Sequence, residues 1–272
     1  LVNAFISDIH SSCRARYLSL LHTFFGIGAF TGPIFAAVLI NHGISWNSTF
    51  LILGIICLII ILLYGIIVKN VHFEEKKGNS FNPKEYLSLV FNPKVLILSF
   101  IMFIYSAHQW GLSTWLPMYM EDYVGSGQIL SSIALSSFWI GIILGRLICS
   151  YISLKVNIKN MLIWCSFIGG IILTVGFLIN TPFAIIIFSG VTGLLTGATV
   201  PMLVTVGCNH FPKNAGAVSS MIFLYGTYSR MIFPWLIGLV AETFNFRWGI
   251  LITSFTLIIS GTLSLMLPSD KK

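Results

Sequence analysis

The sequence predicts an all-α fold, a polytopic bundle of transmembrane helices. Three observations predict it: 56% of the 272 residues are hydrophobic, only 8% are charged, and long apolar stretches recur along the chain. A soluble domain carries about 25% charged residues, and about 20 apolar residues in a helix span the hydrocarbon core of a bilayer. Lipid offers no water to exposed backbone groups, and the stretches lack the alternation of barrel strands, so we expect helices.

About eight segments are long and apolar enough to be full spans. We expect them at residues 15–40, 46–68, 95–119, 127–153, 160–180, 182–208, 215–241 and 247–267. Residues 1–12 are similar to the end of a further span. The polar stretch VKNVHFEEKKGNSFNPKEYLSLVFNPK, between the second and third spans, predicts a linker with a short surface helix near residues 84–91.

The positions of Lys and Arg predict the orientation of these spans. They fall in alternate loops, and the positive-inside rule assigns such loops to the cytoplasm. The basic residues of that side are Arg14, Arg16, Lys69, Lys76, Lys77, Lys84, Lys94, Lys155, Lys159, Lys213, Lys271 and Lys272. We therefore expect a multi-pass protein of the cell (plasma) membrane, surrounded by the lipid bilayer, with a cytoplasmic C-terminus. The net charge of +7 reflects this topology, and the sequence has no aromatic-interleaved basic patch, so we expect no nucleic-acid partner.

The sequence gives no sign of catalytic, metal or cofactor chemistry. The five cysteines lie in or beside the spans without metal-ligand or disulfide spacing, which is typical of small core residues. No GxxxxGK[ST] phosphate-binding motif occurs. An intramembrane enzyme, the hypothesis from a different class, would need acidic, His or Ser groups clustered at one depth. The spans contain scattered serines but no such set, so we expect no enzyme, no metal site and no cofactor.

An internal repeat indicates a larger arrangement of helices. TFFGIGAFTGPIFAAVLINHGISW and YGTYSRMIFPWLIGLVAETFNFRW each place a Trp thirteen or fourteen residues after a Pro, at an offset of about 201 residues. Transporters built from two related bundles show such duplications. The offset predicts twelve spans in the intact protein, three to four of them upstream of residue 1. Residues 1–68 would then be the remnant of an N-terminal six-helix bundle, 69–94 a cytoplasmic linker and 95–272 a C-terminal six-helix bundle.

Local motifs resemble those of one known family. GAFTGP (28–33) is similar to the GxxxGP motif of a fifth helix. WLP (115–117), FWIGIILGR (138–146) and FP (233–234) resemble segments of the seventh, eighth and eleventh helices. On these motifs the chain resembles the major facilitator superfamily, and within it the fucose/glucose permease-like sugar transporters.

The resemblance implies secondary active transport of a small polar solute, a sugar, by alternating access with coupling to an ion, the proton. The acids that take part in proton coupling in such relatives belong to the first and fourth helices, largely outside this sequence. The chain departs from many relatives at Gln109, where they have glutamate, and at Arg230, where they have glycine. Two alternatives stay open: an efflux antiporter of the same superfamily, with a predominantly aromatic and Met-lined cavity, and a truncated, non-functional fragment.

Polar residues in the span at 95–119 predict a substrate site. Tyr105, Gln109 and Ser113 recur every fourth residue, with His108 beside them and Trp115 one heptad beyond His108. An amide both donates and accepts hydrogen bonds, and an aromatic ring covers the apolar face of a pyranose. We therefore expect Tyr105, His108, Gln109 and Trp115 to contact a sugar. A polar seam between helices is the alternative.

Arg230 is the one charged residue between Lys213 and Glu242. It shares a helical stripe with small and polar residues, Thr227 among them, so we expect it to point into the bundle. A charge at the bilayer centre costs about 2.5–3.5 kcal/mol on insertion scales and marks a pathway or an ion pair. Three hypotheses follow: Arg230 binds substrate together with Thr227, its counter-charge lies upstream of this sequence, or backbone carbonyls cap it in a structural role.

Several Gly, Pro and His residues predict helix packing and flexibility. Glycine pairs four residues apart let helix backbones approach closely, and in a transporter the same contacts would slide or hinge. The residues of this group are Gly28, Gly32, Gly141, Gly145, Gly193 and Gly197, with the motif prolines Pro33, Pro201 and Pro234. We expect Pro201 to kink or hinge the span at 182–208, with nearby threonine hydroxyls bonding the freed carbonyl. His22 is interpreted as a hydrogen-bonded structural histidine.

Overall fold

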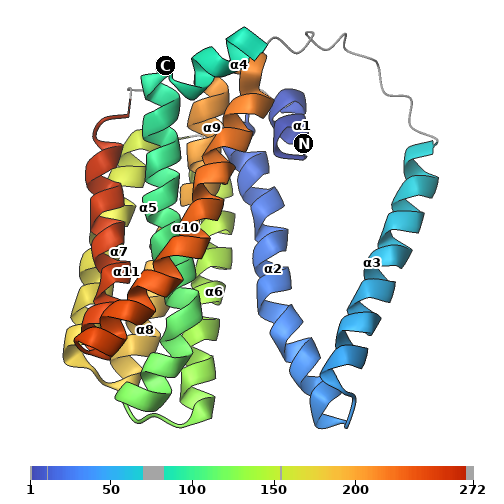
Figure 1. Cartoon of the computed structure of the whole chain (residues 1–272). Helices are drawn as coiled ribbons and strands as arrows, with labels where there is room; N and C mark the ends of the chain where they lie inside the picture. Colours follow the sequence, from blue (N-terminus) through green and yellow to red (C-terminus); the bar gives the residue numbers. More distant parts are fainter. Residues whose placement is uncertain (1, 11, 70–82, 154, 268–272) are drawn as a thin grey trace. The chain divides into compact units, whose positions relative to one another are not determined.

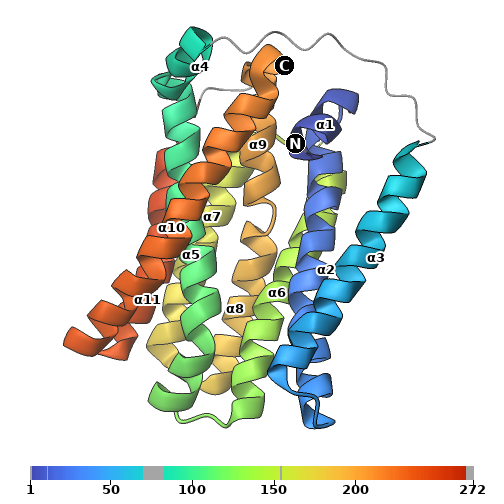
Figure 2. The same cartoon turned by 45° about the vertical axis from the view of Figure 1, so that its right-hand side comes forward.

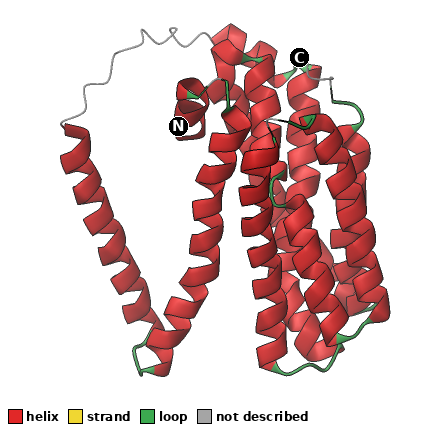
Figure 3. Cartoon of the chain, turned by 180° about the vertical axis from the view of Figure 1, so that it is seen from behind, coloured by secondary structure: helices red, strands yellow, loops and turns green. Residues whose placement is uncertain are grey.

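The computed structural model describes residues 2–10, 12–69, 83–153 and 155–267, and in these ranges every regular element is helical (Figure 3). The helices are α1 (Val2–Ile9), α2 (Arg14–Asn41), α3 (Trp46–Lys69), α4 (Pro83–Val90), α5 (Pro93–Met118), α6 (Gln128–Ile152), α7 (Ile158–Ile179), α8 (Pro182–Thr196), α9 (Thr199–His210), α10 (Ala215–Thr243) and α11 (Phe246–Ser264). A π-helical turn, Tyr119–Tyr123, follows α5, and a short 3-10 turn, Pro212–Asn214, precedes α10. The predicted all-α fold is confirmed.

The predicted spans coincide with these helices, except that the span at 182–208 forms two, α8 and α9. The short surface helix predicted near 84–91 is α4, whereas most of the predicted linker, residues 70–82, lies outside the described residues. Within the described residues, six helical segments are long and apolar enough to cross a membrane. They are Trp46–Ile66, Pro93–Tyr123, Gln128–Ile152, Ile158–Ile179, Pro182–His210 and Phe246–Ser264.

Capping residues set where several of these helices begin. Asn92 precedes α5, and its side-chain oxygen accepts a 3.0 Å hydrogen bond from the Lys94 amide. Asn157, Thr181 and Asn245 cap α7, α8 and α11 in the same way. The first turn of a helix has N–H groups without partners in the helix, and such side chains satisfy them. Short polar sequences between the apolar runs therefore define the helix boundaries.

The chain forms two compact units, Leu1–Ile27 with Lys84–Lys272, and Gly28–Pro83. In the first unit, α5 packs against α10 and α11, α6 packs against α8, and α7 packs against α8 and α11. The close pairing of α5 and α10 is visible in both views (Figures 1 and 2). The second unit contains the end of α2 and all of α3, joined by a short turn that includes Gly43 at φ +81°.

The interface between α6 and α8 depends on glycine. A Cβ atom on Gly141 would overlap the carbonyl oxygen of Gly190, and one on Gly193 would overlap that of Phe138. Gly145 and Gly197 are equally tight, each against backbone of the opposite helix. Helices in lipid associate largely through such close packing, because lipid supplies no hydrophobic drive. By contrast, a Cβ built on Gly28 or Gly32 meets no atom within 4 Å among the described residues of the second unit, apart from the backbone of its own helix.

Candidate functional site

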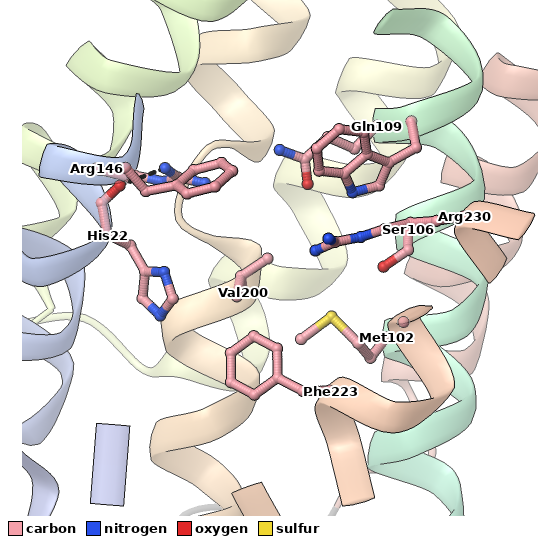
Figure 4. A pocket seen from close by; sticks show the side chains of 11 residues that line it. His22, Met102, Ser106, Gln109, Arg146, Val200, Phe223 and Arg230 are labelled. Atoms are coloured by element: carbon pink, nitrogen blue, oxygen red, sulfur yellow. Dashed lines mark hydrogen bonds between the residues drawn. The ribbon is translucent and has the colours of Figure 1, made fainter. Parts of the chain in front are cut away.

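A cavity of about 130 Å³ lies in the first unit, between helices that are far apart in the sequence (Figure 4). It is lined by His22, Phe25, Met102, Ser106, Gln109, Trp110, Arg146, Val200, Phe223, Gly226 and Arg230. These residues come from α2, α5, α6, α9 and α10. The lining combines aromatic and apolar side chains with a few polar groups.

Ser106 and Gln109 bring polar groups from α5 to the cavity. Their spacing of three residues places them on the same face of the helix. Both are buried in the protein, at 3% and 4% exposure. No hydrogen bond of either side chain to another described residue is present, although a buried hydroxyl or amide normally has a partner. The two groups therefore remain available to a molecule in the cavity.

Arg230 reaches the cavity from α10. Its guanidinium carbon lies 4.3 Å from the centroid of the Trp110 ring, a cation–π contact that fixes the position of the side chain. Gly226 lies one turn earlier on α10, and a Cβ atom there would come within 3.0 Å of Ser106 Oγ. Glycine at this position thus lets α10 approach α5 closely. Among the described residues, Arg230 has neither a hydrogen-bond acceptor nor an acidic partner.

Arg146 is a second guanidinium at the cavity and is buried, at 1% exposure on α6, whereas the Arg230 side chain is exposed. Its Nε donates a 3.0 Å hydrogen bond to the Gly197 carbonyl, and its Nη1 donates to the His22 carbonyl. In Figure 4, Arg146 and Arg230 lie on opposite sides of the pocket. Arg146 is thus held by backbone carbonyls, whereas Arg230 is held by an aromatic ring.

The span at 182–208 is broken at the level of this cavity. α8 ends at Thr196 and α9 begins at Thr199, and Figure 2 shows the gap between them. The carbonyls of Thr196 and Gly197 accept hydrogen bonds from Tyr105 Oη, at 3.0 Å, and from Arg146 Nε. The predicted interruption is therefore present, and it includes Gly197, whose carbonyl lies four residues before Pro201 and lacks a helical donor for that reason. The donors to these carbonyls come from other helices rather than from the nearby threonines. Pro201 is the third residue of α9, where an N–H would have no partner within the helix.

The described part of the chain gives this cavity a positive charge. Two guanidinium groups line it, and no Asp or Glu does. The described acids whose side chains are placed lie elsewhere: Glu121 and Asp122 in the turn after α5, and Glu242 at the end of α10. Glu242 is twelve residues from Arg230 on the same helix, a separation of about 18 Å.

Comparison with known proteins places the chain in a family. The model of the Major Facilitator Superfamily matches residues 1–234. The chain belongs to the Major Facilitator Superfamily. Together with the six helices able to cross a membrane, this makes it an integral, multi-pass membrane protein. The superfamily is one of membrane transporters rather than enzymes.

Individual relatives within the superfamily are distant. The chain is 25% identical over 270 residues to the Protein TsgA homolog of Buchnera aphidicola subsp. Baizongia pistaciae, covering 94% of this chain and 66% of the relative. It is 24% identical over 261 residues to the glucose/mannose transporter GlcP of Bacillus subtilis, covering 90% and 63%. The membrane sensor protein UhpC of Escherichia coli is 24% identical over 201 residues, covering 71% and 46%. The chain spans about half to two thirds of the length of the curated relatives it matches.

The structure brings together only two of the residues expected to contact substrate, Gln109 and Arg230. The other four lie outside the lining of this cavity. Tyr105 is fully buried and bonds the Thr196 carbonyl, and His108 is fully buried with Nδ1 donating to the Thr253 carbonyl at 3.1 Å. The Tyr105 hydroxyl and His108 Nδ1 are thus directed at helix backbone, as in the polar seam that the sequence left as an alternative, whereas His108 Nε2 is buried without a partner among the described residues.

The remaining two expected contacts also point at backbone. Trp115 donates from its indole N–H to the Pro234 carbonyl at 2.8 Å, and its ring packs beside Gly238. Thr227 is exposed and donates to the Phe223 carbonyl of its own helix at 3.0 Å. Both side chains thus donate to backbone carbonyls of α10 rather than to the cavity.

Sequence reasoning missed Arg146, Ser106 and Trp110 as parts of the cavity. Arg146 ends the motif FWIGIILGR, which served to recognise a helix and not a site. The argument applied to Arg230, a lone charge within an apolar span, would have selected Arg146 too. His22 was interpreted as a hydrogen-bonded structural histidine, yet its Nε2 is buried without a partner among the described residues.

Proposed function

We propose that this chain forms part of a secondary active transporter that binds a small polar solute, a sugar or sugar derivative, in the cavity and moves it by alternating access. The observation that carries the proposal is the set of uncommitted polar groups on one cavity: Ser106, Gln109 and Arg230 face it and bond no other described residue. Ser106 and Gln109 are buried, and polar groups are costly to bury without a partner, whereas the Arg230 side chain is exposed. A polar solute would supply the missing partners.

The sugar class is supported by hydrogen-bonding capacity and by one relative. The Gln109 amide both donates and accepts, and the Ser106 hydroxyl does the same, which suits neighbouring sugar hydroxyls. Phe25, Trp110 and Phe223 add aromatic surface for the apolar face of a pyranose. GlcP, a glucose/mannose transporter by name, is 24% identical to the chain.

Coupling and orientation are part of the same proposal. The cavity lining contains no acid among the described residues, so we propose that a coupling proton is carried by acids other than these lining residues. The basic loops support a cell-membrane protein with a cytoplasmic C-terminus.

Binding to the purified chain tests the proposal. Radiolabelled glucose, mannose and glucuronate are equilibrated with the chain in phosphatidylcholine nanodiscs, and with the variants Gln109→Ala and Thr227→Ala. We expect saturable binding of at least one sugar, weakened roughly tenfold by Gln109→Ala, since one or two hydrogen bonds are lost. Thr227→Ala is the matched control, because Thr227 bonds only its own helix, and it should leave binding unchanged. Absence of saturable binding, or equal loss in both variants, would contradict the proposal.

A further inference from the structure

We propose that the solute carries an oxyanion, a carboxylate or a phosphate, and that Arg230 binds this group with Arg146 as a second, fixed positive charge. The inference rests on the proposed function, because it names the chemical class of the solute in the same cavity. It starts from the difference between the two arginines that line the pocket.

Arg146 has the partners of a structural arginine. Its Nε and Nη1 donate to the carbonyls of Gly197 and His22, so its position is set by the backbone of α8 and α2. A guanidinium has five N–H donors. Nη2 of Arg146 donates to no described residue. Arg146 therefore keeps N–H donors for a ligand, while its other two bonds hold the guanidinium plane in place.

Arg230 has none of these partners. No carbonyl or carboxylate of the described residues accepts a hydrogen bond from it, so the carbonyl-capped structural role fits Arg146 and not Arg230. The Trp110 ring positions the guanidinium without using any acceptor. All its N–H donors therefore remain available to a bound group, next to Ser106 and Gln109 (Figure 4).

The charge of the pocket selects the kind of group that binds. A neutral sugar would satisfy N–H donors but would leave the buried charge of Arg146 and the exposed charge of Arg230 without an opposite charge at the cavity. An oxyanion satisfies the donors and also supplies the opposite charge, and hydrogen bonds between charged partners are about twice as strong as neutral ones. The planar fork of Arg matches the two oxygens of a carboxylate or a phosphate. Ser106 and Gln109 would then bind hydroxyls of the same solute.

Four probes separate these possibilities: glucose, glucuronate, glucose 6-phosphate and inorganic phosphate. Dissociation constants are measured by equilibrium dialysis, at constant ionic strength, with the chain in nanodiscs of uncharged phosphatidylcholine. We expect glucuronate or glucose 6-phosphate to bind at least roughly tenfold more tightly than glucose, as a charge-assisted pair predicts. Which of the two binds more tightly distinguishes a carboxylate from a phosphate ester. Inorganic phosphate should bind more weakly than either, because it makes no contact through hydroxyls.

Variants of Arg230 test whether this residue is responsible for the preference for anionic sugars over glucose. Arg230→Met should reduce the preference for the anionic sugars to within about twofold while leaving glucose binding measurable, which also shows that the variant is folded. Arg230→Lys keeps the charge without the planar fork and should give an intermediate preference. Arg16→Met is the matched control: Arg16 also lies over an aromatic ring, with its guanidinium carbon 5.7 Å from the centroid of Tyr151, but outside the cavity.

Three results would overturn the inference. If glucose bound as tightly as both anionic sugars, the claim that the solute carries an oxyanion would be wrong, but the proposed function would still stand. A preference for the anionic sugars that survives in Arg230→Met, or that is lost equally in Arg16→Met, would place the anion elsewhere. Failure of every probe to bind would contradict both the inference and the proposed function.

Discussion

Arg146 and Gly197 are joined by a 3.0 Å hydrogen bond from the arginine Nε to the glycine carbonyl, at the point where α8 ends. The same guanidinium donates to the His22 carbonyl, so one side chain bonds the backbone of two helices from a third. A helix interrupted inside a membrane leaves carbonyls without partners, and these must be satisfied by protein. Arg146 and Tyr105 do this here, which makes the broken helix part of the wall of the cavity.

Replacement of Arg146 should destabilise the protein more than replacement of other arginines. Arg146→Met has a similar length but leaves the Gly197 carbonyl without its donor. We expect the free energy of unfolding to fall by about 1–3 kcal/mol, the usual cost of a buried unsatisfied group. The measurement is denaturation of the detergent-solubilised chain followed by circular dichroism. Arg16→Met, at a less buried position, should cost under about 0.5 kcal/mol; equal losses in the two variants would be inconsistent with this role for Arg146.

Added volume at the α6–α8 contact should be poorly tolerated. Gly193→Ala introduces a methyl group where the Phe138 carbonyl already lies, so the helices must separate. Overpacking of this kind costs about 1–3 kcal/mol. Gly54→Ala is a matched helical control, since no atom of the described residues is within 4 Å of the new methyl group, and it should be neutral or slightly stabilising. The melting temperatures of the two variants are compared by thermal denaturation. Equal melting temperatures would contradict the close packing of α6 against α8 at Gly193.

Trp115 should affect stability rather than solute binding. Trp115→Phe retains an aromatic ring but loses the 2.8 Å hydrogen bond to the Pro234 carbonyl. We expect a loss of about 0.5–1.5 kcal/mol in stability and an unchanged dissociation constant for glucuronate. The sequence predicted a substrate contact for this residue, and a marked weakening of glucuronate binding at normal stability would support that prediction instead.

Cysteine labelling tests the topology. In a Cys-free variant, Gly127→Cys and Lys213→Cys place single thiols in loops that the basic residues assign to opposite sides of the membrane. An impermeant maleimide should label residue 127 in intact cells and residue 213 only after permeabilisation. Labelling of residue 213 in intact cells would reverse the assignment.

Much of the fold could be predicted because the bilayer restricts it. The length of each apolar stretch predicted where the helices lie, and Asn and Thr residues cap the first turn of several of them. The hydrogen bonds at the break after Thr196 were harder to predict, because the donors come from α5 and α6, which are distant in sequence. Pro201 predicted an interruption and frees the carbonyl of Gly197, but the donors that satisfy it could be identified only in the structure.

The site could be predicted only in part, for a similar reason. Gln109 and Arg230 were found because a polar group in an apolar span requires a partner. The same rule selected His108, whose partner is the Thr253 carbonyl, 145 residues further along the chain. A sequence pattern shows that a polar side chain needs a partner, but not whether that partner is backbone or solute. Three-dimensional packing separates the two cases.

Protection of a single thiol in the cavity tests the central claim, that this cavity holds the solute. Ser106→Cys is introduced into the Cys-free chain, and its reaction rate with a small methanethiosulfonate reagent is measured with and without saturating glucose or glucuronate. Because a solute bonded to Gln109 and Arg230 would cover residue 106, we predict that at least one of the two sugars slows the reaction roughly tenfold. The rate at Gly127→Cys, in a loop outside the cavity, should not change. An unchanged rate at residue 106, under conditions in which either sugar is bound, would contradict the account.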